Sequence, residues 1–341
     1  MKRPTYVFLK SFGSVRRVAD LAVRMLAALV ITAVCPLAAA ADFPQRAIQV
    51  ILSFPPGGAT DVLARELAKK MGDTLGQSIV VLNRPGAGGF IGMQAGARAD
   101  PDGYVLYVSS VMSNAIYEGV NGKQSVSLLS DFVPVGGIAS APHILIAPTK
   151  IQVDDFSELV EHLKSAPGKY NYASMGAGTL SNLEAEIFLE QTGTKAMQIP
   201  YKGSGQALPE VIDGTSAFMF DSVTSALPHV QGNRIKVLGV ASAKRLALMP
   251  DVSTMKELGV DGLEAENLFA LMAPAGTPDD RVAVVADALR QAQEDPAFVK
   301  AIGAQGFQVS EIDRAALPGF ITDQQRFWRE KVKELNIGAP K

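Results

Sequence analysis

Short apolar runs alternate with segments of helical periodicity along most of the chain, and this alternation restricts the fold more than any other feature of the sequence. A first series runs over 47–138: residues 47–54 are a predicted strand, and 61–75 a predicted helix, because apolar side chains recur along one of its faces. A second series runs over 144–241. Strands that alternate with helices form parallel sheets with helices on their faces. The sequence therefore predicts an α/β fold of two lobes, each a mainly parallel sheet flanked by helices, followed by a strand at 268–273 and three C-terminal helices.

Composition and charge exclude several classes of protein. Of the 341 residues, 48% are hydrophobic and 19% are charged, so the chain can bury a core and is not disordered. It has 32 basic and 34 acidic residues, but the first 41 positions hold six of the basic residues and one of the acidic residues. The remainder carries 26 basic and 33 acidic side chains, a net charge of −7. Nucleic-acid binding needs clustered positive charge, so no nucleic-acid partner is expected.

The N-terminal 41 residues have the layout of a secretory signal peptide. Basic residues end at Arg24, an apolar stretch follows at 25–34, and small residues lead to Ala41. We predict cleavage after Ala41 and delivery to the periplasm. A permanent membrane anchor is the alternative, but a span needs about 20 apolar residues. The one cysteine, Cys35, lies in this segment, so the mature chain is expected to have no disulfide, no thiolate metal site and no cysteine nucleophile.

Two loops that contain glycine stand between a predicted strand and a predicted helix. The first reads Phe-Pro-Pro-Gly-Gly-Ala-Thr-Asp at 54–61, and the second reads Ser-Met-Gly-Ala-Gly-Thr at 174–179. Glycine lets backbone amides approach a ligand, and the N-terminus of a helix attracts an anion. In open α/β sheets, ligands bind beyond the carboxyl ends of the strands. The two loops are therefore predicted to face each other and hold a small anion; the alternative is that both are tight structural turns.

The sequence contains no recognisable motif for a cofactor, a metal ion or catalysis. A third glycine loop, at 84–92, departs from the dinucleotide-binding pattern because Ile91 stands where that pattern requires glycine, so we interpret it as a structural turn. His143, His162 and His229 are far apart and have no metal-ligand spacing, so we expect each to be solvated or to cap a helix. The chain is thus predicted not to be an enzyme and to use no cofactor and no metal.

Asp221 follows the apolar run 217–220 and is expected at the carboxyl edge of a sheet. It precedes a predicted helix at 222–231, which fits the role of a helix N-cap. Its place at the edge of a sheet also fits a contact in a ligand cleft. The sequence leaves both roles open, and one carboxylate can serve both.

The motifs occur in an order that resembles the Bug family, the substrate-binding proteins of tripartite tricarboxylate transporters. The resemblance covers nearly all of 43–337, and its motifs are each weak but together specific. Besides the loops at 54–61 and 174–179, they include Asn-Arg-Pro-Gly-Ala-Gly-Gly at 83–89, Pro-Asp-Gly-Tyr at 101–104, Asp-Phe-Val-Pro-Val at 131–135, Pro-Tyr-Lys-Gly at 200–203, Phe-Asp at 220–221 and Ala-Pro-Ala-Gly-Thr-Pro at 273–278.

This resemblance implies a two-lobe periplasmic binding protein of type II, the Venus-flytrap fold, whose lobes are joined by two crossings. Lobe 1 is expected to comprise 42–142 plus 265–341, and lobe 2 to comprise 143–264; the third loop then follows an outer strand. The family holds its ligand through backbone amides and ordered waters between the lobes. Carried onto this chain, the ligand-binding residues are Pro56, Gly57, Gly58, Thr60, Asp61, Ser109, Ser110, Ser174, Gly176, Gly178, Thr179, Asn182 and Asp221.

The sequence departs from the family at positions that could line the pocket. Asn182 stands where the family often has histidine, and Leu268 and Ala270 stand where it tends to have an aromatic residue and a glycine. The ligand of a relative therefore cannot be transferred to this chain.

The function that the resemblance implies is that of an extracytoplasmic solute receptor. Such a protein closes over a small organic carboxylate as a monomer and delivers it to integral membrane transporter subunits. One alternative is a sensory binding protein that presents its ligand to a membrane receptor. Another is a periplasmic enzyme on the same scaffold, for which no nucleophile, metal set or cofactor motif is identifiable.

Overall fold

The computed structural model describes Met1 and residues 43–121, 125–264 and 266–334, and the fold lies within the compact unit Phe43–Lys341. The predicted signal peptide and its cleavage site lie outside the described residues. In the described part of the chain, no helix is both long enough and apolar enough to cross a membrane.

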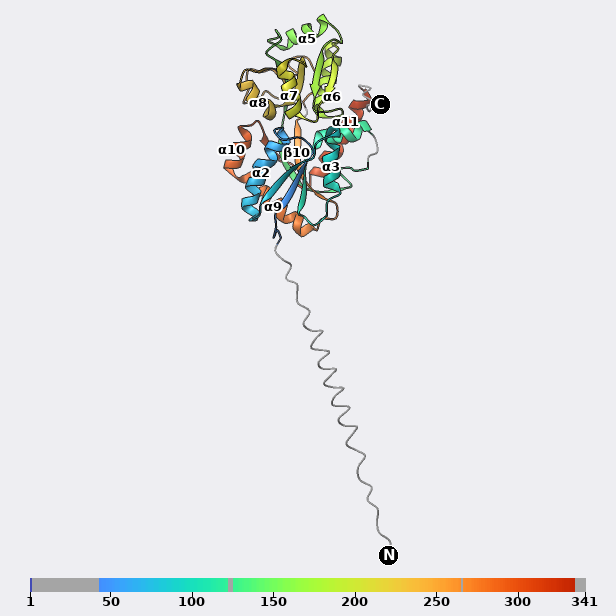
Figure 1. The fold of residues 1–341 in the computed structure, drawn as a ribbon, viewed down its shortest axis with the longest axis vertical. Helices are drawn as coiled ribbons and strands as arrows, with labels where there is room; N and C mark the ends of the chain where they lie inside the picture. Colours follow the sequence, from blue (N-terminus) through green and yellow to red (C-terminus); the bar gives the residue numbers. More distant parts are fainter. Residues whose placement is uncertain (2–42, 122–124, 265, 335–341) are drawn as a thin grey trace. The chain divides into compact units, whose positions relative to one another are not determined.

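The strands of the described chain form two sheets (Figure 1). The first sheet has, in spatial order, the strands β11 (Gln308–Val309), β4 (Phe132–Ala141), β10 (Asn267–Pro274), β3 (Val105–Ser110), β1 (Ile48–Leu52) and β2 (Ile79–Asn83). β1 pairs in parallel with β2 and β3, whereas β10 runs antiparallel to β3 and β4, and β11 runs antiparallel to β4. β2 is an edge strand, as the position of the third glycine loop implied.

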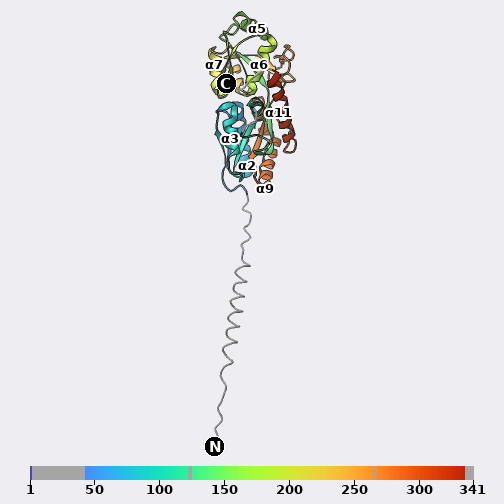
Figure 2. The ribbon, with the colours of Figure 1, turned by 90° about the vertical axis from the view of Figure 1, so that its right-hand side faces the viewer.

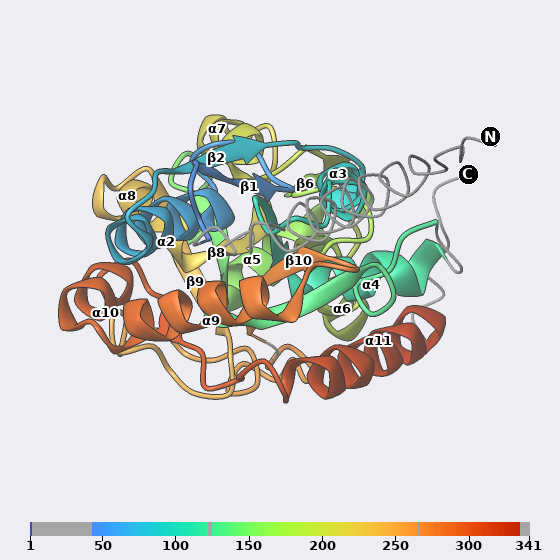
Figure 3. The same cartoon turned by 90° about the horizontal axis from the view of Figure 1, so that it is seen from below.

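The first sheet is covered on both faces because its strands are apolar on both faces. Alternate residues of β10, such as Phe269 and Leu271, pack with the apolar side chains of three helices: α2 (Ala59–Leu75), α9 (Asp279–Glu294) and α10 (Pro296–Gly303). The intervening residues, such as Leu268 and Met272, pack in a second cluster with α3 (Phe90–Ala97), α4 (Val111–Asn121) and α11 (Leu317–Glu334). Figure 3 shows these two groups of helices on opposite sides of the sheet.

The second sheet lies in the part of the chain between β4 and β10. Its strands, in spatial order, are β7 (Met197–Pro200), β6 (Asn171–Ser174), β8 (Phe218–Ser222), β5 (His143–Pro148) and β9 (Ile235–Ala241). β6 pairs in parallel with β7 and β8, and β5 runs antiparallel to β8 and β9. One face packs with α7 (Ser204–Asp213) and α8 (Val223–Gln231), and the other with α5 (Phe156–Ser165) and α6 (Leu180–Thr192).

The chain passes between the two sheets twice, from β4 to β5 and from β9 back to β10. The last three helices then return to the first sheet, and α11 lies alongside α4 (Figures 2 and 3). The predicted α/β fold of two lobes and its C-terminal helices are confirmed. Both sheets are mixed, because β5 and β10, which follow the crossings, enter their sheets against the direction of most of their neighbours. The helix α4 forms where the sequence showed only weak periodicity.

Candidate ligand-binding cleft

The two lobes contact each other through loops that precede helices. The β1–α2 loop of the first lobe reaches the start of α7, where a Cβ added at Gly205 would lie 2.9 Å from the carbonyl oxygen of Pro56. Beside it, a Cβ added at Gly88 would lie 2.9 Å from the carbonyl oxygen of Ala177 in the β6–α6 loop. A side chain would not fit at either position, so glycine allows the lobes to approach this closely. The structure is therefore a closed form.

A small cavity of about 20 Å³, room for about one water molecule, lies between the lobes at a place where four helices begin. Its lining includes residues 58–60 at the start of α2, Ser110 and Ser113 at the start of α4, Ser204 at the start of α7 and Ser222 immediately before α8. The remaining residues of the lining are Phe54, His143, Met175, Asn267 and Phe269. Both lobes thus contribute polar groups to one enclosed space.

Three of these helices begin without a side-chain cap. Their N-cap residues are Gly58, Gly203 and Ser222, and none of them accepts a hydrogen bond from a backbone amide of its helix. By contrast, α5 and α10 are capped by the carboxylates of Asp155 and Asp295, which accept bonds from amides of their helices. The first amides of a helix have no partner within it, and each N-terminus carries roughly half a positive charge. Uncapped N-termini around one cavity favour an anion there.

Three polar side-chain atoms at the cavity are buried without a hydrogen-bond partner. They are Ser113 Oγ, Ser222 Oγ and His143 Nε2. A buried polar group without a partner costs about 1–3 kcal/mol, and most such groups in native proteins are paired with protein or with water. All three can donate, as can the helix amides. The cavity is therefore suited to a molecule that brings acceptor oxygens.

His143 lies in this cavity, which corrects the expectation that it is solvated or caps a helix. It is the first residue of β5, has no exposed surface, and its Nδ1 lies 2.6 Å from Oε2 of the buried Glu184. Burial alone lowers the pKa of His143, but the carboxylate of Glu184, helped by Asp221, raises it above its ordinary value. Burial also raises the pKa of Glu184, against the opposing charge of His143. The other two histidines, His162 and His229, are partly buried elsewhere in the second lobe.

Asp221 stands behind the cavity lining rather than in it. Its carboxylate accepts hydrogen bonds from the hydroxyl groups of Ser204 and Ser225 and from the amide of Ser222. Burial raises its pKa, while these hydrogen bonds and the charge of His143 oppose that change. The carboxylate therefore joins the start of α7 to the start of α8. Ser222, not Asp221, is the N-cap residue by position.

Asp61, in the first turn of α2, holds the first loop in place. Its carboxylate accepts hydrogen bonds from the amide of Gly57, from Asn83 Nδ2 and from the guanidinium of Arg65. Burial would raise the pKa of Asp61, but the hydrogen bonds from Arg65, Asn83 and Gly57 lower it below its ordinary value. Pro56 and Gly57 in the same loop are exposed. The role of Asp61 here is to fix the loop that places Gly58 and Thr60 in the cavity.

The second glycine loop satisfies its own polar groups. Thr179 Oγ1 donates to the carbonyl oxygen of Gly176 at 2.7 Å, and Asn182 Oδ1 accepts from the amide of Gly178 at 3.0 Å. Ser174 Oγ accepts from the side chain of Gln198. The loop faces Gly88 of the third glycine loop, whereas the first loop faces the start of α7. Both loops reach the same cavity, the first through Gly58 and Thr60 and the second through Met175, while their closest contacts across the lobes are with other segments.

Of the residues that the sequence assigned to the site, Gly58, Thr60 and Ser110 line the cavity. Ser110 Oγ donates to Asn267 Oδ1, while the neighbouring Ser109 points its hydroxyl to Asn114 instead. The other assigned residues shape the loops around the cavity, as described above.

The cavity also contains residues that the sequence reasoning missed: Ser113, His143, Ser204, Ser222 and Asn267. A signal existed for two of them, because Ser204 follows a glycine before a helical segment and Ser222 directly precedes another. His143 gave no such signal, since its partner Glu184 is 41 positions away.

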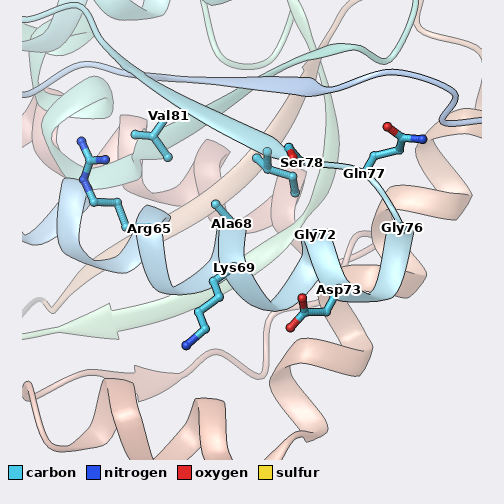
Figure 4. Close-up of a pocket in the computed structure, with 10 residues that line it drawn as sticks. Arg65, Ala68, Lys69, Gly72, Asp73, Gly76, Gln77, Ser78 and Val81 are labelled. Carbon is cyan, nitrogen blue, oxygen red and sulfur yellow. The ribbon is translucent and has the colours of Figure 1, made fainter.

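A larger groove runs along the outside of the first lobe, between α2 and the edge strand β2 (Figure 4). Its volume is about 600 Å³, and its lining includes Arg65, Lys69 and Asp73 of the helix and Ile79 and Val81 of the strand. The groove belongs to one lobe and extends to the C-terminal end of α2, where the helix dipole is negative. It therefore has none of the converging helix N-termini that mark the smaller cavity.

Comparison with known proteins identifies the family of this chain. Residues 63–337 match the family described as the tripartite tricarboxylate transporter family receptor, TctC. Protein BugT of Bordetella pertussis is 36% identical over 294 residues, which are 86% of this chain and 90% of that protein. The solved periplasmic binding protein BugD is 31% identical with a TM-score of 0.83, and the match covers 87% of this chain and 99% of that one.

A structure of an R. palustris protein with adipate is 26% identical to this chain with a TM-score of 0.84, again over 87% of this chain and 99% of the other. Among the described residues, no cluster of three or more His, Cys, Asp or Glu side chains is placed to hold a metal ion. The family match spans most of the chain, and the chain therefore belongs to the tripartite tricarboxylate transporter receptor family.

Proposed function

We propose that this protein is an extracytoplasmic solute receptor that binds a small organic carboxylate between its lobes and delivers it to a tripartite tricarboxylate-type membrane transporter. It acts by binding and release, without catalysis and as a monomer. The signal peptide is removed after Ala41, which places the mature chain in the periplasm. Lobe 1 comprises 42–142 plus 265–341, lobe 2 comprises 143–264, and the crossings between them act as the hinge.

The observation that carries this proposal is the convergence of uncapped helix N-termini from both lobes on one cavity. The uncapped helix α2 comes from the first lobe and the uncapped helices α7 and α8 come from the second, so closing the lobes assembles the site. A carboxylate offers acceptor oxygens and negative charge to these amides at once, without needing an arginine. The adipate in the R. palustris relative is a ligand of this chemical class.

Within this site the residues assigned from the sequence take three roles. Gly58, Thr60 and Ser110 contact the ligand. Asp61 and Asp221 fix the loops that present the helix amides. The second loop packs against the third and so closes the cavity. The residues that shape the second loop for this role are Ser174, Gly176, Gly178, Thr179 and Asn182.

A thermal-shift screen of the exported protein against mono-, di- and tricarboxylates, aromatic acids and acidic amino acids tests the proposal. A ligand present at 100 times its dissociation constant stabilises the folded state by about 2.7 kcal/mol. For a protein of this size, that corresponds to a rise of about 5–10 °C in the melting temperature. Protein that has been unfolded and refolded is screened in parallel, so that a ligand carried through purification does not mask binding.

The variant Gly58→Leu tests whether the ligand-induced thermal shift comes from binding in this cavity. The added side chain enters the cavity, while the backbone of Gly58 is in the extended region that leucine adopts readily. We expect it to abolish the ligand-induced shift and to leave the ligand-free melting temperature within a few degrees of the unaltered protein. Gly319→Leu is the matched control, because Gly319 is an exposed position in α11 with open space around it. No shift with any carboxylate in refolded protein, or an unchanged shift in Gly58→Leu, contradicts the proposal.

Deletion of the gene separates delivery to a transporter from a sensory role. If the protein delivers its ligand to membrane subunits, deletion abolishes uptake of the carboxylate that the screen identifies. If it presents the ligand to a membrane receptor, uptake continues and the transcriptional response to the ligand is lost.

A further inference from the structure

His143 lines the cavity, and one of its ring nitrogens is held by protein while the other is buried without a protein partner. Nδ1 is hydrogen-bonded to Glu184 Oε2 at 2.6 Å, and Nε2 is buried with no partner in the protein. The lining otherwise consists of glycine, alanine, serine, threonine, asparagine, methionine and phenylalanine, so His143 is its one ionisable side chain among the described residues. We propose that His143, oriented by Glu184, is the cation that binds an anionic oxygen of the ligand through Nε2 and makes ligand affinity dependent on pH.

The geometry fixes both the tautomer and the direction of the ring. Glu184 lies in α6, and its side chain and that of His143 are 2% and 1% exposed. A carboxylate at Nδ1 keeps a proton on that nitrogen, as it does for histidines that bind metals or act in catalysis. Because the carboxylate and the ring are both enclosed by packed elements, the ring has little freedom to turn. Nε2 is thereby left for the ligand.

The charges around His143 favour the imidazolium. Of the elements packed against β5, α6 presents Glu184 and β8 presents Asp221, and both raise the pKa of His143 against the effect of burial. On β9, Lys236 pairs with Ala147 near the other end of β5, and its ammonium group is bound to Asp154 and to the carbonyl oxygen of Val153. The first lobe presents no charged side chain to this cavity among the described residues of its lining.

The charge matters because the cavity is closed. An anion removed from water is costly unless an opposite charge or several donors replace the water. Helix N-termini supply partial charges and His143 supplies a full one when it is protonated. The folded-state pKa of His143 is raised, so the cation is present below that pKa and is lost as the pH rises through it. Affinity for an anion should therefore fall as the pH rises through the raised pKa of His143.

This inference rests on the proposed carboxylate-binding function, and two measurements on the exported protein test it. The first is ¹⁵N NMR of the histidine rings in ligand-free protein, with the signals of His143 assigned by their loss in His143→Gln. We expect both ring nitrogens to be protonated at pH 6, below the ordinary histidine value, and the Nε2 signal to shift when the carboxylate found by the screen is added. A neutral ring at pH 6 overturns the inference.

The second measurement is the affinity for that carboxylate between pH 6 and 10, corrected for any ionisation of the ligand itself in this range. We expect the unaltered protein to lose at least tenfold in affinity over this range. Glu184→Gln moves that loss to lower pH, because burial then dominates the pKa of His143. His143→Gln binds at least tenfold more weakly at pH 6 and has a flat profile. His162→Gln, at a partly buried histidine of α5, is the control and behaves like the unaltered protein.

The double variant His143→Gln/Glu184→Gln covers the case in which a single variant fails to fold, because two neutral amides can still hydrogen-bond. It should bind as weakly as His143→Gln. If the unaltered protein binds a carboxylate and the variants at 143 and 184 match its affinity and pH profile, the inference fails and the proposed function stands. If refolded unaltered protein binds no carboxylate, the proposed function fails, and the inference fails with it.

Discussion

Gly205 lies in the first turn of α7, and its position tests whether the closed arrangement of the lobes is the one that holds the ligand. A Cβ at this residue would lie 2.9 Å from the carbonyl oxygen of Pro56 in the opposite lobe, whereas ordinary contacts of a Cβ begin at 3.4 Å. The backbone of Gly205 has no positive φ, so alanine is not strained there. Gly205 does not line the cavity, so Gly205→Ala affects the closure of the lobes and leaves the cavity lining unchanged.

Two opposing effects set the size of the change. Within the second lobe, alanine in place of glycine favours the helix by about 0.5–1 kcal/mol. In the closed form, the added methyl group must push a backbone carbonyl aside, and such overpacking costs about 1–3 kcal/mol. If only the liganded form must close, the gain in helix stability raises the melting temperature of the ligand-free protein by about 1–4 °C. The cost of overpacking in the closed form weakens the affinity for the ligand by about 5- to 150-fold.

The assay is isothermal titration of Gly205→Ala with the carboxylate that the screen identifies, combined with a thermal melt of the free protein. Gly319→Ala is the control, since the added methyl group there meets nothing within 4 Å. It should show the helix stabilisation and unchanged affinity. An affinity of Gly205→Ala equal to that of the unaltered protein would refute the reasoning, because α7 and the first loop would then not meet in the liganded form.

Two further predictions concern the loops that shape the site. Thr179→Val removes the donor to the buried carbonyl oxygen of Gly176, so it should lower the free energy of unfolding by about 1–3 kcal/mol in urea titrations, and an unchanged unfolding midpoint would contradict this role. Asp61→Asn removes the charge that holds Arg65, a side chain that is 53% exposed and therefore screened, so the loss at pH 7 should be about 1 kcal/mol. Because the pKa of Asp61 is lowered in the folded state, its contribution is complete above the unfolded value of about 3.9 and disappears as the pH falls through the lower folded value. The stabilities of Asp61→Asn and the unaltered protein should therefore converge in strong acid, and a constant difference between pH 2 and 7 would contradict this.

The strand–helix alternation predicted most of the fold because periodicity is a local property. The helix α2 buries the face that its spacing indicated, with Leu63, Leu67 and Met71 in the core. The direction of a strand is not a local property, so nothing in the sequence of β5 showed that it runs antiparallel to β8 and β9. The two-residue strand β11 is too short for any periodicity to reveal it.

The parts of the candidate site that could be predicted are those formed by residues close together in the sequence. The first loop was identified because glycine and a helix start are adjacent in the chain, and Gly58 and Thr60 do line the cavity. The network of Asp61 with Arg65, four positions on, also follows from helical spacing. Both glycine loops reach one cavity, but the direct contacts between the lobes, such as Gly205 with Pro56, could not be predicted because they are set by how two separately folded sheets meet. The hydrogen bond between His143 and Glu184 could not be predicted from the sequence for the same reason.

A structure of the protein with its best-binding carboxylate tests the central claim most directly. We expect the lobes to be closed and a carboxylate oxygen to lie within hydrogen-bond distance of the first amides of α2, in the cavity lined by Thr60, Ser113 and Ser222. A ligand bound in the groove between α2 and β2, or one that leaves the amides of α2 untouched, would contradict it.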